Sequence, residues 1–167
     1  MKKLFTGACV ALLILTPATA RAQVGLGGQL NWGDDVDLGI GVRGTYTLPT
    51  TLPLEIIGTF DYFFPSVGVS GIDLNYWELN ANIVYLIPVS SNVVAPYAGT
   101  GLNFAHASVS ATEFTDMSVS DTELGLNVLG GAKFNVGGFM PFGELRVELG
   151  GGEEVILTGG AMVPVGR

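Results

Sequence analysis

Hydrophobic and polar residues alternate with a period of two over most of the chain beyond residue 23. Between Leu38 and Leu48 every second position is apolar or glycine, whereas the positions in between hold glycine, threonine and Arg43. Residues 76–87 and 122–134 show the same alternation. Successive side chains of a strand point to opposite faces, so this pattern predicts β-strands with one apolar and one more polar face.

Eight such segments lie between turn signals. Most are close to the roughly 9 to 11 residues that a tilted strand needs to cross a bilayer. An even number of antiparallel strands can close without leaving unpaired backbone groups in lipid. The sequence therefore predicts an all-β fold, an eight-stranded antiparallel up-and-down transmembrane β-barrel. The predicted strands are Val24–Trp32, Val36–Leu48, Leu54–Phe64, Leu74–Ile87, Ala95–His106, Thr122–Phe134, Phe139–Leu149 and Val155–Val163.

The connections between these strands alternate in character. Those after the second, fourth and sixth strands, residues 49–53, 88–94 and 135–138, contain no charged residue, whereas the other four are acidic. In an up-and-down barrel the two sets lie at opposite ends, as short periplasmic turns and longer external loops do. The acids predicted for the external loops are Asp34, Asp35, Asp37, Asp73, Glu113, Asp116, Asp121, Glu153 and Glu154.

The first 22 residues have the pattern of a secretory signal peptide. Lys2 and Lys3 precede an apolar run, and two small-x-small triplets follow it, ending at Ala20 and at Ala22. Cleavage after Ala22 is preferred because it leaves Gln23 just before the first strand. We therefore expect a cleaved signal at residues 1–22 and one barrel domain at residues 23–167.

Removal of the signal makes the chain strongly acidic. Three of the seven basic residues leave and all fifteen acidic residues stay, which gives a net charge of about −11. Such a surface repels nucleic acid, whose binding depends on Lys and Arg at phosphates.

Three glycine-rich stretches resemble the small outer-membrane β-barrel family of OmpA and OmpX type, which includes many opacity-like surface proteins of the porin family. They are Gly39–Gly44, Pro96–Leu102 and Leu126–Ala132, and the resemblance extends over residues 23–167. It implies the barrel fold and a location in the bacterial outer membrane. It implies little about the function of the protein in that membrane.

The inward face of the predicted barrel holds charges of both signs. An eight-stranded barrel has an interior just wide enough for side chains to fill, so these residues are expected to form a plug. We expect two clusters, one of Arg43 with Asp61 and Glu78, and one of Arg146 with its strand neighbours Glu144 and Glu148. A narrow cation-preferring pore is the alternative, because inward acids outnumber inward bases.

His106 is the only histidine, and Ser108 lies on the same face of its strand. This pair resembles the catalytic pair of outer-membrane lipid A deacylases, with Glu113 or Glu123 as the orienting acid of a triad. Val109 follows Ser108 where that family favours asparagine, and residues 108–120 have the composition of a loop. We therefore predict that the chain is not an enzyme, and deacylation stays an alternative.

The acidic loops are expected to face outer-membrane lipid and lipopolysaccharide. Divalent cations could bridge their carboxylates to lipopolysaccharide phosphates. A dedicated calcium site needs six or more converging oxygens, so no metal site and no cofactor are predicted.

A soluble barrel is the alternative to a membrane barrel. A soluble, lipocalin-like ligand carrier also has eight alternating strands, but its apolar face points inward. The leading interpretation is a monomeric outer-membrane barrel with a structural or surface-interaction role.

Overall fold

The computed structural model describes residues 24–34, 36–65, 72–111, 117–150 and 153–165. The predicted signal peptide therefore lies outside the described residues, as do Asp35, Glu113 and Asp116. Among the described residues, no helix is long and apolar enough to span a membrane.

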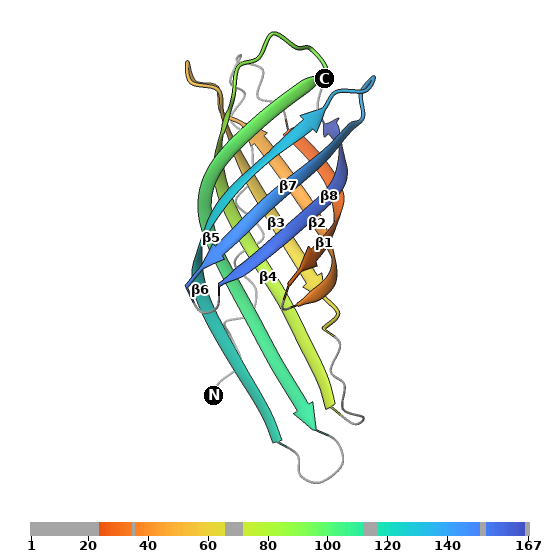
Figure 1. Ribbon diagram of the computed structural model, residues 1–167, viewed down its shortest axis with the longest axis vertical. Coiled ribbons are helices and arrows are strands. Elements are labelled where there is room, and N and C mark those ends of the chain that lie inside the picture. Colours follow the sequence, from red (N-terminus) through yellow and green to blue (C-terminus); the bar gives the residue numbers. More distant parts are fainter. Residues whose placement is uncertain (1–23, 35, 66–71, 112–116, 151–152, 166–167) are drawn as a thin grey trace, which may run out of the picture.

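Eight antiparallel strands form a closed barrel (Figure 1). Each strand pairs with the next along the chain, and β1 pairs with β8 to close the sheet. The predicted fold class is confirmed. The strands are β1 Val24–Gly33, β2 Asp37–Thr47, β3 Leu54–Phe63, β4 Ile72–Leu86, β5 Val94–Ala111, β6 Met117–Phe134, β7 Met140–Leu149 and β8 Glu154–Val165.

The register gives each strand an inner and an outer face. Arg43 pairs with Thr59, and both side chains are buried inside the barrel. Leu30 and Val42 on the outer face are 59% and 62% exposed. An apolar outer wall around a polar interior is the arrangement of a barrel embedded in lipid, and it is the reverse of a soluble ligand-carrying barrel. The lipocalin-like alternative is therefore wrong.

The connections between strands distinguish the two ends of the barrel. The turns after β2, β4 and β6 lie at the same end as the start of β1 and the end of β8, where Val24 pairs with Val165. We call this the turn end, and the opposite end, with the acidic connections, the loop end. Short turns mark the periplasmic side of such barrels and longer loops mark the outside.

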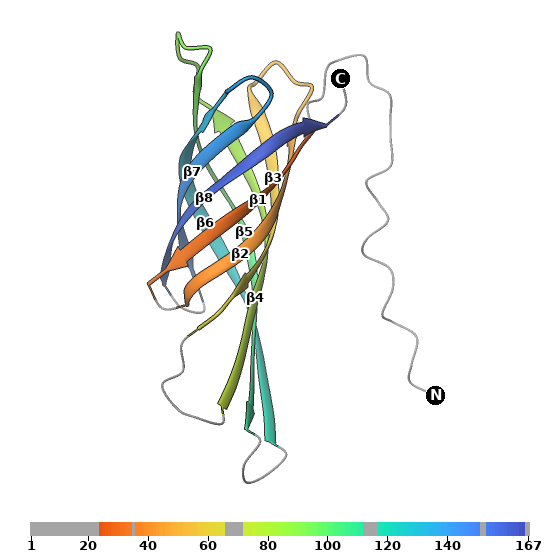
Figure 2. The same ribbon diagram turned by 90° about the vertical axis from the view of Figure 1, so that its right-hand side faces the viewer.

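Three strands are longer than their neighbours. β4, β5 and β6 continue past the rim of the barrel at the loop end (Figure 2). The prediction that residues 108–120 form a loop is therefore partly wrong, because Ser108–Ala111 and Met117–Ser120 are paired strand. Serine and small residues there give a weak strand signal, and the pairing between β5 and β6 outweighs it.

Glycines on the inner face make room for large neighbours. A Cβ at Gly41 would collide with a carboxylate oxygen of Asp61, and a Cβ at Gly39 would lie 2.7 Å from the Phe63 ring. Gly143 and Gly159 on the outer face have no atom within 4 Å of such a Cβ. The inner glycines are therefore required by packing, and the outer pair is not.

Candidate functional site

The structure places all six predicted interior charges inside the barrel. They lie on inward positions of four different strands, and each is at most 5% exposed. The six are Arg43, Asp61, Glu78, Glu144, Arg146 and Glu148. Lys133, Glu55 and Glu154 are buried there as well.

Arg43 on β2 reaches across the interior to Glu144 on β7. Its two terminal nitrogens each donate to one oxygen of the Glu144 carboxylate, which makes a two-point ion pair. The Tyr97 hydroxyl donates to the same carboxylate at 2.8 Å, and the Phe142 ring centroid lies 4.3 Å from Arg43 Cζ. Paired hydrogen bonds between Arg and a carboxylate fix geometry as well as charge. We call these four residues the Arg43 cluster.

Asp61 on β3 is held mainly by neutral donors. Gln29 Nε2 donates to Oδ1 at 2.6 Å and Asn31 Nδ2 at 2.7 Å. Thr59 Oγ1 donates to Oδ2 at 2.7 Å. The nearest cation is Arg146, whose Nη1 lies 3.7 Å from Oδ2. Asn80 Nδ2 also donates to Oδ2 at 3.3 Å, so this fully buried carboxylate is stabilised by hydrogen bonds from side chains on three strands.

Arg146 on β7 faces several carboxylates at once. Its Nη2 lies 3.0 Å from Glu78 Oε2, and its Nε lies 2.7 Å from Glu148 Oε1. The Tyr76 hydroxyl donates to the other oxygen of Glu78 at 2.9 Å. Together with Asp61 and Glu154, these acids and Arg146 form the Arg146 cluster.

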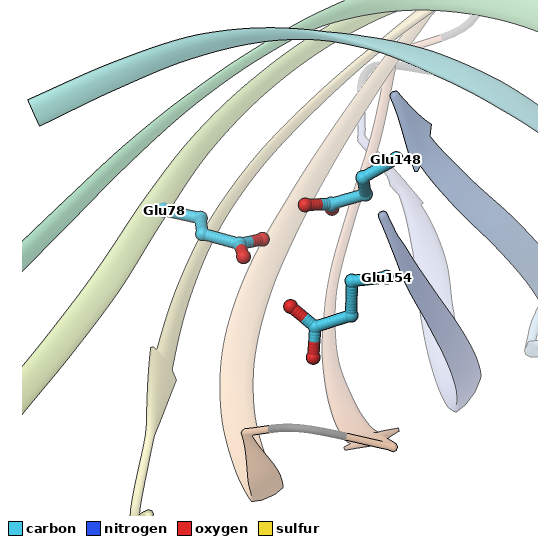
Figure 3. Close-up of side chains that lie close together, drawn as sticks. All are labelled: Glu78, Glu148 and Glu154. Carbon is cyan, nitrogen blue, oxygen red and sulfur yellow. The ribbon is translucent and has the colours of Figure 1, made fainter. Parts of the chain in front are cut away.

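Three carboxylates of this cluster converge near the loop end. Glu78, Glu148 and Glu154 offer oxygens that all lie within 4.8 Å of one another (Figure 3). Within the described part of the chain this is the one group of acidic, histidine or cysteine residues close enough to hold a metal ion. Glu78 and Glu148 already accept hydrogen bonds from Arg146, so a cation there would compete with the guanidinium. The arrangement is first of all an ion-pair network.

Two predictions about these residues are wrong. Glu154 was expected in an external loop, but it is the first residue of β8, is 7% exposed and pairs with Glu148. The predicted partners of the arginines are also different: Arg43 binds Glu144, and Arg146 binds Asp61 and Glu78 in addition to Glu148. The prediction considered neighbours along the wall, whereas long side chains in a narrow barrel also reach across it.

Two clusters of apolar side chains are buried in the interior beside the charged residues. Ile57, Val84 and Leu129 form one layer with Tyr97. Val36, Phe63 and Ile156 form another, with Tyr76 packed against it. The strand periodicity places every one of these side chains except Val36 on an inner face, but their packing into layers is visible only in three dimensions.

A vestibule of about 360 Å³ opens at the turn end. Lys133 and Glu55 line it and form an ion pair with each other. Thr47 donates a hydrogen bond to the second oxygen of Glu55 at 3.3 Å. A buried ion pair therefore lines the opening at the turn end.

His106 and Ser108 lie on the outer face of β5. His106 Nδ1 lies 2.9 Å from Thr122 Oγ1, and its ring lies 5.1 Å from that of Trp77. Glu123 occupies the opposite face of β6 from Thr122, so it does not point toward the histidine. The proposed triad is not assembled among the described residues, and Glu113 lies outside them.

Of the other predicted loop acids that the structure describes, Asp34 and Glu153 lie in connections at the loop end. The loop prediction is wrong for Asp37, which begins β2, and for Asp73 and Asp121, which belong to β4 and β6. Asp34, Asp37 and Glu153 are exposed. Asp34 Oδ1 accepts a hydrogen bond from the Val155 backbone N–H at 3.1 Å, which links the first connection to the start of β8. The exposed rim is therefore acidic, as the sequence predicts.

The polar residues that hold the charged clusters were not singled out by the sequence. Tyr97, Gln29 and Asn31 each donate a hydrogen bond to a buried carboxylate. All three occupy inward positions of their strands, so the alternation already assigns them to the interior. Which carboxylate each one reaches depends on side-chain positions that a strand pattern does not contain.

Comparisons with known proteins agree with this architecture. Residues 5–149 match a family model described as an outer membrane protein beta-barrel domain. A search of curated proteins gives no match.

Three solved structures illustrate the likeness. Ail, the attachment invasion locus protein of Yersinia pestis, is 18% identical with a TM-score of 0.57, over 86% of this chain and 97% of that one. The N-terminal β-barrel domain of Pseudomonas aeruginosa OprF is 15% identical with a TM-score of 0.65, over 86% and 97%. Neisserial surface protein A is 17% identical with a TM-score of 0.65, over 85% and 96%. At these identities the likeness concerns the fold.

Proposed function

The chain belongs to the outer membrane protein β-barrel family, and from that premise we propose that it is a sealed membrane scaffold with a structural and surface-interaction role. In this proposal the barrel carries no solute, and its loop end presents an acidic surface to the outside.

The observation that carries the sealed interior is the burial of the Arg146 cluster. Arg146, Asp61 and Glu78 have side chains with no exposed surface, and Arg146 on β7 reaches across the interior to the neighbouring strands β3 and β4. Two buried apolar clusters, around Ile57 and Phe63, fill further parts of the interior. An ion path would require water along these charges, and breaking a buried ion pair costs about 3 to 5 kcal/mol.

The surface role is supported by what the loop end presents. Asp34 and Glu153 are exposed at the rim, and β4, β5 and β6 extend beyond it. Carboxylates at the loop-end rim can be bridged by divalent cations to lipopolysaccharide phosphates. Ail and Neisserial surface protein A carry names that refer to attachment and to the cell surface, which agrees in kind with this role.

A narrow cation-preferring pore is the second candidate. One observation favours it: among the residues that the structure describes, the buried interior holds six acids and three bases. A pore with that balance would favour cations.

Conductance in planar lipid bilayers separates the two candidates. The wild-type protein is expected to give no steady current in potassium chloride, because the charged clusters and apolar layers fill the interior. Arg43→Ala should open intermittent current if the Arg43 cluster closes the interior. A stable, cation-selective current from the wild type would contradict the proposal and establish the pore.

A further inference from the structure

The vestibule at the turn end is bounded by all eight strands. Each strand contributes at least one residue to its lining. The next inward residues on β3, β4 and β5 are Ile57, Val84 and Tyr97, which belong to the buried apolar layer. The vestibule therefore ends at that layer. Its volume of about 360 Å³ lies within the range of small-molecule sites, roughly 300 to 1,000 Å³.

Two buried side chains of opposite charge lie next to each other in this lining. Lys133 on β6 and Glu55 on β3 are 8% and 4% exposed. Within the described part of the chain, Lys133 Nζ donates to Glu55 Oε1, which leaves two of its three N–H groups for a ligand. The other oxygen of Glu55 accepts a single bond of 3.3 Å, from Thr47. A molecule in the vestibule can therefore accept from Lys133 and donate to Glu55.

The opposite signs of this pair restrict the class of ligand. Among the described residues, Lys133 and Glu55 are the only charged ones that line the vestibule. A bound anion would meet the Glu55 carboxylate and a bound cation would meet the Lys133 ammonium, and either would leave a net charge at a buried place. A zwitterion keeps the site neutral. An α-amino acid carries its ammonium and its carboxylate on one carbon, so its two charges lie as close together as those of the ion pair.

The rest of the lining favours an apolar side chain on that ligand. Leu86, Met140 and Pro164 line the vestibule from β4, β7 and β8, and Val93 lines it from the connection after β4. Leu86 also packs against the apolar layer. Burial of an apolar side chain among these residues is favourable because it removes apolar surface from water.

We propose that the vestibule binds a free α-amino acid with an apolar side chain, of the size of leucine. The carboxylate of the amino acid accepts hydrogen bonds from Lys133 Nζ, and its ammonium donates to the Glu55 carboxylate. Its side chain contacts Leu86 and Met140. The ligand is held at the mouth of the barrel and does not pass the apolar layer. This inference goes beyond the proposed surface role, which concerns the opposite end.

The test uses the complete mature chain in lipid nanodiscs and tritiated L-leucine, with binding measured by equilibrium dialysis up to about 10 mM. Saturable binding of one leucine per chain is expected. Two competitors each lack one charge: 4-methylpentanoate has no ammonium, and L-leucinamide has no carboxylate. Each should compete about tenfold less well or worse. Glycine keeps both charges without the side chain and should also compete roughly tenfold less well.

Two variants locate the site. Lys133→Met combined with Glu55→Gln removes both charges without leaving one unpaired, and it should weaken leucine binding about tenfold or more. Ala95 lines the vestibule and pairs with Lys133 across β5 and β6, so Ala95→Trp keeps the ion pair, fills the space and should abolish binding. Asp34→Asn combined with Glu153→Gln changes charges at the loop end and should leave leucine binding within about twofold of the wild type.

Several outcomes would overturn the inference. If 4-methylpentanoate competes as well as leucine, the vestibule is an anion site, and if L-leucinamide does, it is a cation site. Glycine that equals leucine would contradict the apolar contacts. Unchanged binding in Ala95→Trp would place leucine elsewhere on the barrel, and this variant decides the matter if the charge variant fails to fold. Absence of saturable leucine binding to the folded wild type would refute the proposal.

Discussion

Arg43 and Arg146 occupy the same barrel interior but meet different numbers of acids. Arg43 has one carboxylate partner, Glu144, which it binds through two hydrogen bonds. Arg146 forms ion pairs with Asp61, Glu78 and Glu148, and Glu154 lies against the last two. In formal charge the Arg43 cluster is neutral, whereas the Arg146 cluster has three negative charges in excess.

The difference shows two ways of keeping charge inside a protein. In the Arg43 cluster the ion pair itself satisfies both partners, with Tyr97 as an additional donor. In the Arg146 cluster one cation cannot pair with every carboxylate, so neutral side chains donate hydrogen bonds to the remaining oxygens. Asp61, for example, accepts from Gln29, Asn31 and Thr59. A hydrogen bond to a charged group contributes about 1.5 to 3 kcal/mol. The excess negative charge lies toward the loop end.

Loss of Arg146 is expected to have the largest effect. Arg146→Met leaves four buried acids without a cation, so the free energy of unfolding should fall by about 5 kcal/mol. The measurement is a urea titration of the protein folded in phospholipid vesicles, followed by the fluorescence of its two tryptophans. Adding Glu78→Gln and Glu148→Gln to the variant should recover part of the loss. An unchanged midpoint in Arg146→Met would show that neutral donors alone hold these acids.

Loss of Arg43 should cost less. Arg43→Met leaves a single acid, Glu144, which keeps the hydrogen bond from Tyr97, and we expect a loss of about 3 kcal/mol in the same titration. The double variant with Glu144→Gln is the control, and it should regain most of the stability because no unpaired charge remains. If Arg43→Met proves as harmful as Arg146→Met, the number of stranded acids is not what separates the two clusters.

The smallest expected effect has the opposite sign. Glu154 pairs directly with Glu148 across β7 and β8, so Glu154→Gln removes a repulsion between like charges and should raise the free energy of unfolding by about 0.5 kcal/mol. Glu153→Gln, at an exposed neighbour, is the matched control and should leave the midpoint where it is. A destabilised Glu154→Gln variant would mean that this carboxylate stabilises the barrel by accepting bonds.

Much of the fold follows from the sequence because a strand imposes a strict period. The alternation from Leu38 to Leu48 assigns Arg43 to the interior, and the turn between β2 and β3 sets its register with Thr59. The loop-end parts of β5 and β6 were missed since serines there resemble a loop in composition. Their strand structure depends on pairing between segments, which local composition does not record.

The interior could be predicted as a set of residues but not as a set of contacts. The pattern gives the face on which Arg43 and Glu144 lie, and it gives their neighbours along the wall. It does not give what lies opposite, because that depends on strand tilt and on the diameter of the closed barrel. The sequence misplaces Glu154 for a related reason, since the adjacent acids Glu153 and Glu154 follow three glycines and both have the composition of a connection.

The glycines of the wall bear on how such a sequence can evolve. Replacement of Gly41 or Gly39 would push against Asp61 or Phe63, so a change there must be matched by a second change inside. Gly143 and Gly159 face outward with free space around them, and each can accept a larger side chain alone. The lineage can therefore adapt its outer wall to membranes of different thickness and composition by single substitutions, while the interior is inherited nearly as one unit.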